Sequence, residues 1–129
     1  MKVSDFKVTS IRMSSVNFEL CNNNYDGNIE YDFNSKYSLA EDGKNIGRIA
    51  MEIRVFPTIE KPPFRINMKM EGMFEWSEGI KKDELEMYLS VNGNAVLYSY
   101  ARPILTQLTT FAGCNPLFMP LMNFVDNEE

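Results

Sequence analysis

Apolar and polar residues alternate through the first half of the chain, which predicts β-strands. A first strand carries Phe6, Val8 and Ser10 on one side and continues through Val16, Phe18 and Leu20. Residues 29–34, 49–55 and 66–71 alternate in the same way. Strict alternation is typical of antiparallel strands with one buried face. Residues 41–44 should form the turn between the second and third strands, and the prolines at 57, 62 and 63 should separate the third from the fourth.

The second half of the chain has helical spacing instead. Residues 81–89 fit a short helix that Asn92-Gly93 should end. From Ala95 to Ala112 apolar residues recur every three or four positions, which predicts an amphipathic helix capped by Gly113. Pro103 lacks a backbone donor, so we expect a kink there or a helix that begins near it. Strands followed by helices indicate an α+β fold, with a four-stranded antiparallel sheet covered by helices on one face, in a single domain over residues 1–129.

Net charge and hydropathy exclude several classes of protein. The chain has 13 basic and 18 acidic residues, a formal charge of -5, so we expect no nucleic-acid partner, which would need clustered Lys and Arg. No apolar run approaches the length of about 18 residues that a membrane span needs, so we expect no membrane insertion. The first six residues lack the apolar core of a signal peptide. A cytoplasmic location is therefore the expectation.

Residues that usually carry catalysis or hold metals are scarce. The sequence has no histidine, and its two cysteines, Cys21 and Cys114, are far apart and lack CxxC spacing. Histidine is the usual acid–base group near neutral pH and a common zinc ligand. Nor is there a glycine-rich phosphate loop. We expect no cofactor, no metal and no enzymatic activity.

The C-terminal stretch of residues 115–124 is apolar, yet prolines at 116 and 120 keep it from forming a regular helix. It should lie extended across the helices or the sheet edge and expose part of its apolar surface. Nine methionines and 16 aromatic residues suit adaptable binding of apolar segments. Burial in the core is the alternative for each of these side chains. The expected polypeptide-binding residues are Tyr25, Phe56, Phe64, Phe118, Met119, Leu121 and Met122.

Two C-terminal motifs carry a resemblance to a known family. The sequence Leu-Tyr-Ser-Tyr-Ala-Arg at 97–102 is followed by Pro-Leu-Phe-Met-Pro-Leu-Met-Asn-Phe at 116–124. With the first strand around Val16-Asn17-Phe18-Glu19, this chain resembles the SecB family of protein-export chaperones. The resemblance implies a molecular chaperone that binds non-native preproteins and keeps them unfolded for the Sec pathway. It also implies a homotetramer, a dimer of dimers, that delivers its clients to SecA.

The resemblance assigns roles to further positions. It implies that Ile66, Met68 and Met70 support the oligomer interface and that Glu19 belongs to the surface that docks SecA. Ser15 and Asn67 stand where the family has acids, which puts SecA delivery in question. Two alternatives therefore stay open. One is a SecB-like chaperone of a toxin–antitoxin system, and the other is a non-catalytic protein-interaction module.

Overall fold

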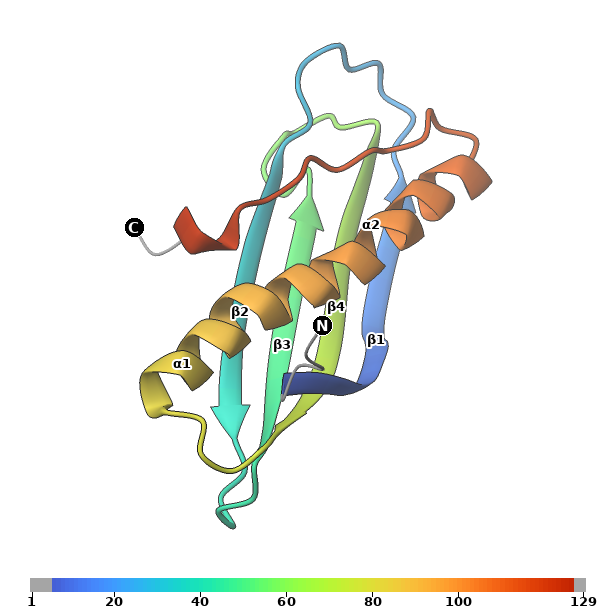
Figure 1. Ribbon diagram of the computed structural model, residues 1–129. Coiled ribbons are helices and arrows are strands. Elements are labelled where there is room, and N and C mark those ends of the chain that lie inside the picture. Colours follow the sequence, from blue (N-terminus) through green and yellow to red (C-terminus); the bar gives the residue numbers. More distant parts are fainter. Residues whose placement is uncertain (1–5, 127–129) are drawn as a thin grey trace.

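A computed structural model describes residues 6–126 as one antiparallel sheet crossed by a helix (Figure 1). The strands are β1 (Phe6–Leu20), β2 (Tyr31–Leu39), β3 (Ile46–Val55) and β4 (Phe64–Trp76), and they lie in the order β1-β4-β3-β2. The helical elements are α1 (Lys82–Met87), a π-helical stretch η1 (Tyr88–Gly93), α2 (Asn94–Phe111) and a short 3₁₀ turn η2 (Phe124–Asp126). The predicted α+β fold, with its four-stranded antiparallel sheet and helices on one face, is confirmed.

The core lies between the sheet and α2. Alternate residues of β3 and β4 face the helix. They pack against Leu97, Ala101 and Leu105 of α2, which are one helical turn apart. These positions follow the periods of two and of three to four that the sequence displays, because each element buries only one face. Within residues 6–126, no helix combines the length and the hydropathy that crossing a bilayer requires.

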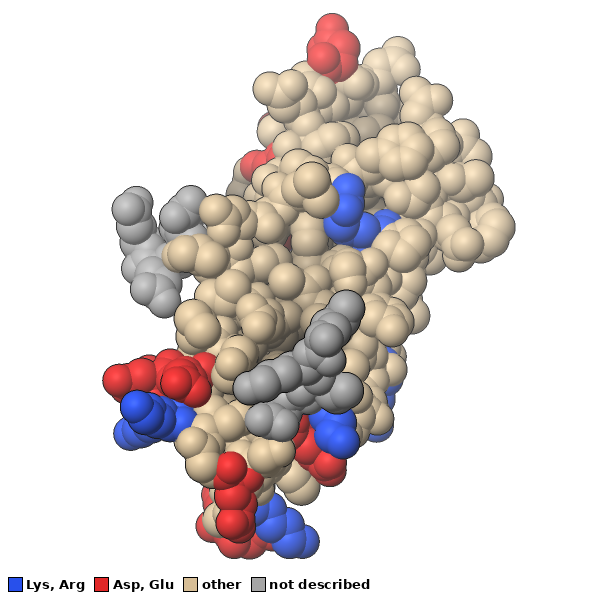
Figure 2. Space-filling view, in the orientation of Figure 1, with Lys and Arg blue, Asp and Glu red and all other residues tan. Residues whose placement is uncertain are grey.

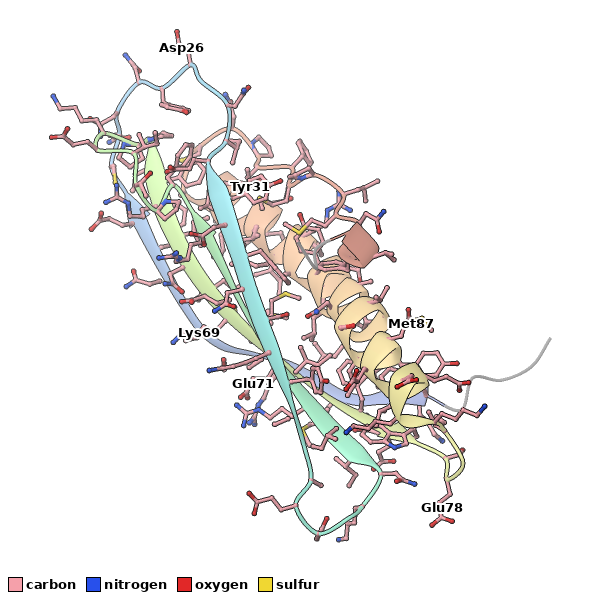
Figure 3. All side chains as sticks on the ribbon, turned by 90° about the vertical axis from the view of Figure 1, so that its left-hand side faces the viewer. Asp26, Tyr31, Lys69, Glu71, Glu78 and Met87 are labelled. Atoms are coloured by element: carbon pink, nitrogen blue, oxygen red, sulfur yellow. The ribbon has the colours of Figure 1, made fainter. Side chains whose placement is uncertain are left out.

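The opposite face of the sheet is polar and open. Glu71 on β4 bridges two arginines from the neighbouring strands, with Arg12 Nε at 2.8 Å and Arg48 Nη2 at 2.5 Å. The hydrogen bond from Arg12 is the main cause that lowers the pKa of the Glu71 carboxyl. Lys69 and Glu71 project from this face in Figure 3, away from the helix. These side chains give the sheet its solvent-facing side.

The residues expected at the oligomer interface lie inside the chain instead. Ile66, Met68 and Met70 are 1, 0 and 2% exposed, because this side of β4 packs beneath α2. Side chains without exposed surface in one chain have none to offer to another. The expectation for these three residues is therefore wrong, and any contact between subunits must use other surface.

The prediction that the helix ends at Asn92-Gly93 is wrong. The chain stays helical through η1 and enters α2 at Asn94, and Pro103 lies within α2 rather than near its start. Gly93 is buried against Ile49 of β3, and a methyl group there would overlap the end of the Ile49 side chain. This glycine therefore serves close packing rather than a break. Gly113 does follow α2 in the predicted left-handed conformation, with φ +83°.

Gly93→Ala is expected to destabilise the protein, although alanine favours helices. The overlap with Ile49 forces a shift in a packed core, which typically costs about 1–3 kcal/mol. Urea unfolding measures the loss. Ile49→Val removes the overlapping methyl at a cost of about 0.5–1.5 kcal/mol by itself. In the double variant the two costs should fall short of additive, and full additivity would show that the contact does not matter.

Candidate functional site

An extended segment, residues 115–123, runs back across α2 toward β2, and we call it the strap (Figure 1). Side chains on one face of α2 hold its main chain. Tyr98 Oη donates to the Pro120 carbonyl at 2.5 Å, and Arg102 Nε donates to that of Met119 at 3.1 Å. Thr106 Oγ1 donates to the Leu117 carbonyl at 2.6 Å. These residues are four apart in a helix, so they form one row beneath the strap.

The strap alternates between buried and exposed side chains. Leu117 and Met119 are 3 and 1% exposed and complete the core, whereas Phe118 and Leu121 are 76 and 83% exposed. Met119 is therefore a core residue, and its expected role in polypeptide binding is wrong. Met122 is half-buried. The strap thus presents large apolar side chains to solvent from a backbone that is fixed to the helix.

Thr109→Val is expected to loosen the strap. The buried Thr109 hydroxyl accepts the N–H of Leu117 at 2.9 Å, and valine of the same shape would leave that donor unpaired. An unsatisfied buried donor costs about 1–3 kcal/mol, which thermal unfolding would detect. Thr110→Val is the matched control, because the Thr110 hydroxyl is exposed and bonds only to the Thr106 carbonyl. Equal effects of the two variants would contradict this role of Thr109.

At its N-terminal end the strap borders a cavity of about 490 Å³, which we call the loop recess. The recess brings together four of the expected polypeptide-binding residues: Tyr25, Phe56, Phe64 and Phe118. Phe56 and Phe64 are only 0 and 5% exposed, so they form its floor and belong to the core rather than to an open channel. Tyr25 and Phe64 both pack edge-on against Phe56, with ring centroids 5.0 and 5.4 Å apart.

The loop after β3 is fixed beside this recess. The Glu30 carboxylate accepts the N–H groups of Thr58 and Ile59 at 2.9 and 3.0 Å, as well as the Thr58 hydroxyl. The Thr58 hydroxyl is the largest cause that lowers the pKa of Glu30. Phe56 has φ +55°, a conformation that costs free energy for a bulky residue and persists only where the surroundings hold it. The floor of the recess is therefore preformed.

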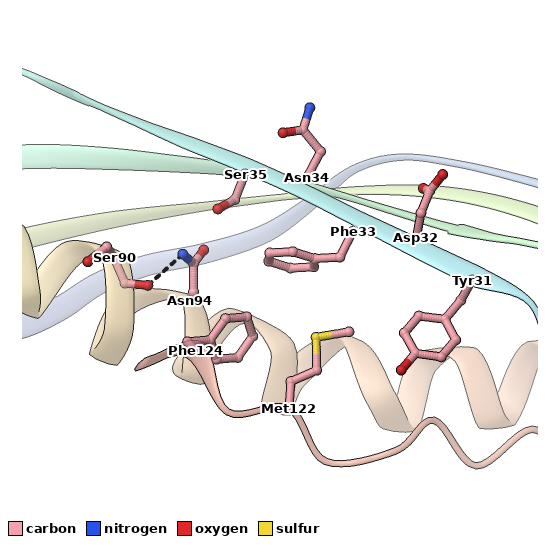
Figure 4. A pocket seen from close by; sticks show the side chains of 9 residues that line it. All are labelled: Tyr31, Asp32, Phe33, Asn34, Ser35, Ser90, Asn94, Met122 and Phe124. Atoms are coloured by element: carbon pink, nitrogen blue, oxygen red, sulfur yellow. Dashed lines mark hydrogen bonds between the residues drawn. The ribbon is translucent and has the colours of Figure 1, made fainter. Parts of the chain in front are cut away.

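At its C-terminal end the strap borders a second hollow beneath β2 (Figure 4). A cavity of about 560 Å³ is lined by Tyr31, Phe33, Met122 and Phe124, among others. A neighbouring cavity of about 300 Å³ extends it to Tyr37 and Leu89, and the two share Ser35, Ser90 and Asn94. We call the pair the β2 groove. From Tyr31 to Tyr37 it follows the strand for about 20 Å, and β2 pairs with β3 alone, so its other edge is open.

The remaining expected site residues lie outside these hollows. Leu121 projects from the strap between them and lines neither. Glu19 lies on β1, opposite Arg65 of β4, beside a small hollow that Asn17 and Asn67 complete on the polar face of the sheet. Ser90 and Asn94, which line the β2 groove, were not among the residues predicted from the sequence. The signal available was an asparagine inside a helix, where its intrinsic propensity is poor.

Charge is nearly absent from α2 and the strap. Between Tyr88 and Val125 the sequence has a single charged residue, Arg102. In Figure 2 the surface over α2 and the strap is correspondingly uncharged around one basic side chain. Among residues 6–126, no three His, Cys, Asp or Glu side chains lie close enough together to bind a metal ion. The chemistry that this side offers is apolar contact and main-chain hydrogen bonding.

Comparison with solved structures places this fold among known ones. A SecB-like chaperone of Mycobacterium tuberculosis, solved with a peptide of the HigA1 antitoxin, superposes with a TM-score of 0.76 at 15% identity. The match covers 92% of this chain and 91% of that one. A Streptococcus agalactiae protein of unknown function is more distant, with a TM-score of 0.53 and 10% identity over 93% of this chain and 100% of that one.

Sequence comparison identifies the family. The chain is 27% identical over 79 residues to the protein-export protein SecB of Anaplasma phagocytophilum, which is 59% of this chain and 50% of that protein. It therefore spans about half the length of this curated relative. The family model described as SecB, preprotein translocase subunit SecB, matches residues 5–126. The chain belongs to the SecB family.

Proposed function

We propose that this chain is a chaperone, not an enzyme, that binds unfolded polypeptide segments in the cytoplasm and needs no cofactor. The observation that carries the proposal is the pair of hollows at the two ends of the strap, each lined in part by aromatic side chains, with Phe118 and Leu121 exposed between them. Large apolar side chains exposed beside a hollow are typical of an interaction site. Family membership and the relative named a protein-export protein support the same role.

Apolar contact and an open strand edge suit clients of varied sequence. An extended client segment would gain main-chain hydrogen bonds along β2, because every residue carries the same backbone groups. Its apolar side chains would enter the hollows, where Met122 and the aromatic residues offer adaptable contact. Neither interaction requires a defined sequence. Both require that the client be unfolded, since a folded protein hides these groups.

The test is whether the purified chain prevents the aggregation of an unrelated protein diluted from denaturant. We expect light scattering by the client to fall as the chain approaches equimolar concentration, without ATP. An equal amount of an inert protein of similar size is the control. If the chain does not reduce the aggregation of several clients, it is not a general holding chaperone. The alternative function, a non-catalytic protein-interaction module, would then stand.

Two classes of client are considered for this chaperone. Export of preproteins, with delivery to SecA, is supported by the family and by the curated relative. Protection of an antitoxin is suggested by the fold shared with the chaperone that was solved with an antitoxin peptide. Ser15 and Asn67, uncharged where the family has acids, weigh against SecA docking. Calorimetric titration with SecA separates them, because binding favours export and its absence favours the second assignment.

We propose a homo-oligomer, a tetramer built from dimers, whose interface uses the uncharged outer face of α2. Tyr100, Ile104 and Phe111 recur on one side of this helix, and Phe111 is largely exposed. Light scattering should give a mass above that of one chain at micromolar concentration. Tyr100→Asp with Phe111→Asp should reduce it to the monomer, because charges there would be buried unpaired. Asn92→Asp, on the exposed surface of η1, is the control. A wild-type monomer would contradict the proposal.

A further inference from the structure

An unpaired acceptor lies buried at the middle of the β2 groove. Asn94 is 7% exposed, and its side-chain Nδ2 donates to the Ser90 carbonyl at 2.7 Å. Its Oδ1 has no hydrogen-bond partner among the described residues. A buried acceptor without a partner is unfavourable, and asparagine is also a poor helix former. The chain therefore carries two costs at this position that a leucine or an alanine would avoid.

The acceptor lies in the wall of the hollow, with less than 1 Å² of its own surface accessible. Asn94 lines both cavities of the β2 groove and so stands at their junction. Figure 4 shows Oδ1 turned away from Ser90 and toward β2, on the side where Ser35 and the ring of Phe33 hang down from the strand. Phe33 and Phe124 form an aromatic wall beside it, with ring centroids 5.2 Å apart. A group that enters the groove thus meets aromatic surface, the hydroxyls of Ser35 and Ser90, and the wall that holds this acceptor.

We propose that Asn94 is a specificity-determining residue that favours client segments with a tyrosine, whose hydroxyl donates to Oδ1. This rests on the proposed function, since the ligand is a held client. The aromatic body of tyrosine suits the wall of Phe33 and Phe124, and its hydroxyl is a donor at the far end of the ring. Phenylalanine would fill the same space and leave Oδ1 unpaired.

The cavity is large enough for this occupant. At about 560 Å³ it lies within the range that ligand pockets span, about 300–1,000 Å³. Five of its lining residues, 31–35, belong to β2, the edge strand along which an extended segment would run. Alternate side chains of such a segment turn toward the groove, so one aromatic residue enters while its neighbours face solvent.

Two labelled peptides that differ by one oxygen atom test the inference. Each is a ten-residue unfolded peptide with a single central aromatic residue, tyrosine in one and phenylalanine in the other. Fluorescence anisotropy with the full chain should give about tenfold tighter binding of the tyrosine peptide, the effect of one hydrogen bond to a buried acceptor. In Asn94→Leu the ratio should fall to about one, while the phenylalanine peptide binds at least as tightly as before. Asn67→Leu, on the polar face of the sheet, should keep the tenfold ratio.

Each outcome of this experiment either supports or overturns the role of Asn94. Equal binding of both peptides by the wild-type chain overturns the role of Asn94, as does a tenfold ratio that survives Asn94→Leu. The wild-type ratio decides without any variant, should Asn94→Leu fail to fold. If neither peptide binds while aggregation is still suppressed, the specificity is wrong and the holding function stands. If neither peptide binds and no client is held, both proposals fall.

Discussion

Met68→Asp should leave no folded protein. The Met68 side chain has no exposed surface and lies on β4 beneath α2, within the main core cluster. A carboxylate there would lose its hydration without a partner, at a cost of several kcal/mol. Whole domains are stable by only about 5–15 kcal/mol, so this one change removes most or all of the stability. Circular dichroism of the purified variant should show the spectrum of an unfolded chain.

Two control variants make this result specific. Lys69→Asp places the same charge on the next residue, which faces solvent on the polar side of the sheet, and should remain folded. Met68→Leu keeps an apolar side chain of similar size and should cost less than about 1.5 kcal/mol. If Met68→Asp instead remains folded and only dissociates the oligomer, then this face of β4 meets another subunit and not α2.

Phe118→Ser combined with Leu121→Ser is expected to abolish most client holding while the fold persists. Both side chains stand largely in solvent, so their loss should change stability by no more than about 0.5 kcal/mol each. Clients would lose the two most exposed large side chains of the strap, and large contacts of this kind commonly dominate binding. We expect at least tenfold more chaperone to be needed for the same suppression of aggregation.

The matched control removes similar apolar side chains far from the strap. Val8→Ser with Met13→Ser alters two exposed residues of β1, at the opposite edge of the sheet from β2, and should leave holding unchanged. Thermal unfolding and light scattering on every variant verify fold and mass. A strap variant that folds and holds clients as well as the wild type would place client binding elsewhere.

The sheet could be predicted from sequence because each strand has one buried face. Residues 49–55 and 66–71 alternate strictly, and both ranges lie within strands of the structure, β3 and β4. The second strand was placed at residues 29–34 but runs from Tyr31 to Leu39. Its later residues, Asn34-Ser35-Lys36, are polar on both sides, since an edge strand over a hollow buries little. Periodicity is weak where burial is weak.

Gly93 shows why the helix could not be delimited from sequence alone. A glycine inside a helix is unfavourable by its own propensity, and so it reads as a break. Here the close approach to Ile49 decides, and that contact joins residues far apart in the chain. The orientation of the side chains in the functional site also depends on contacts between residues far apart in the sequence. The strap was expected to lie extended, but which of its side chains face the core depends on the row of hydrogen bonds from α2, which no local pattern reveals.

Because the same row of hydrogen bonds goes to main-chain carbonyls, the position of the strap does not depend on which side chains it carries. Tyr98, Arg102 and Thr106 grip carbonyl oxygens, and every amino acid supplies a carbonyl. The outward positions 118 and 121 are therefore free to change without releasing the strap. Evolution could retune the preferred clients one residue at a time, and a laboratory library confined to these positions should yield mostly folded variants. Mutational tolerance and client choice would then coincide on the same few residues.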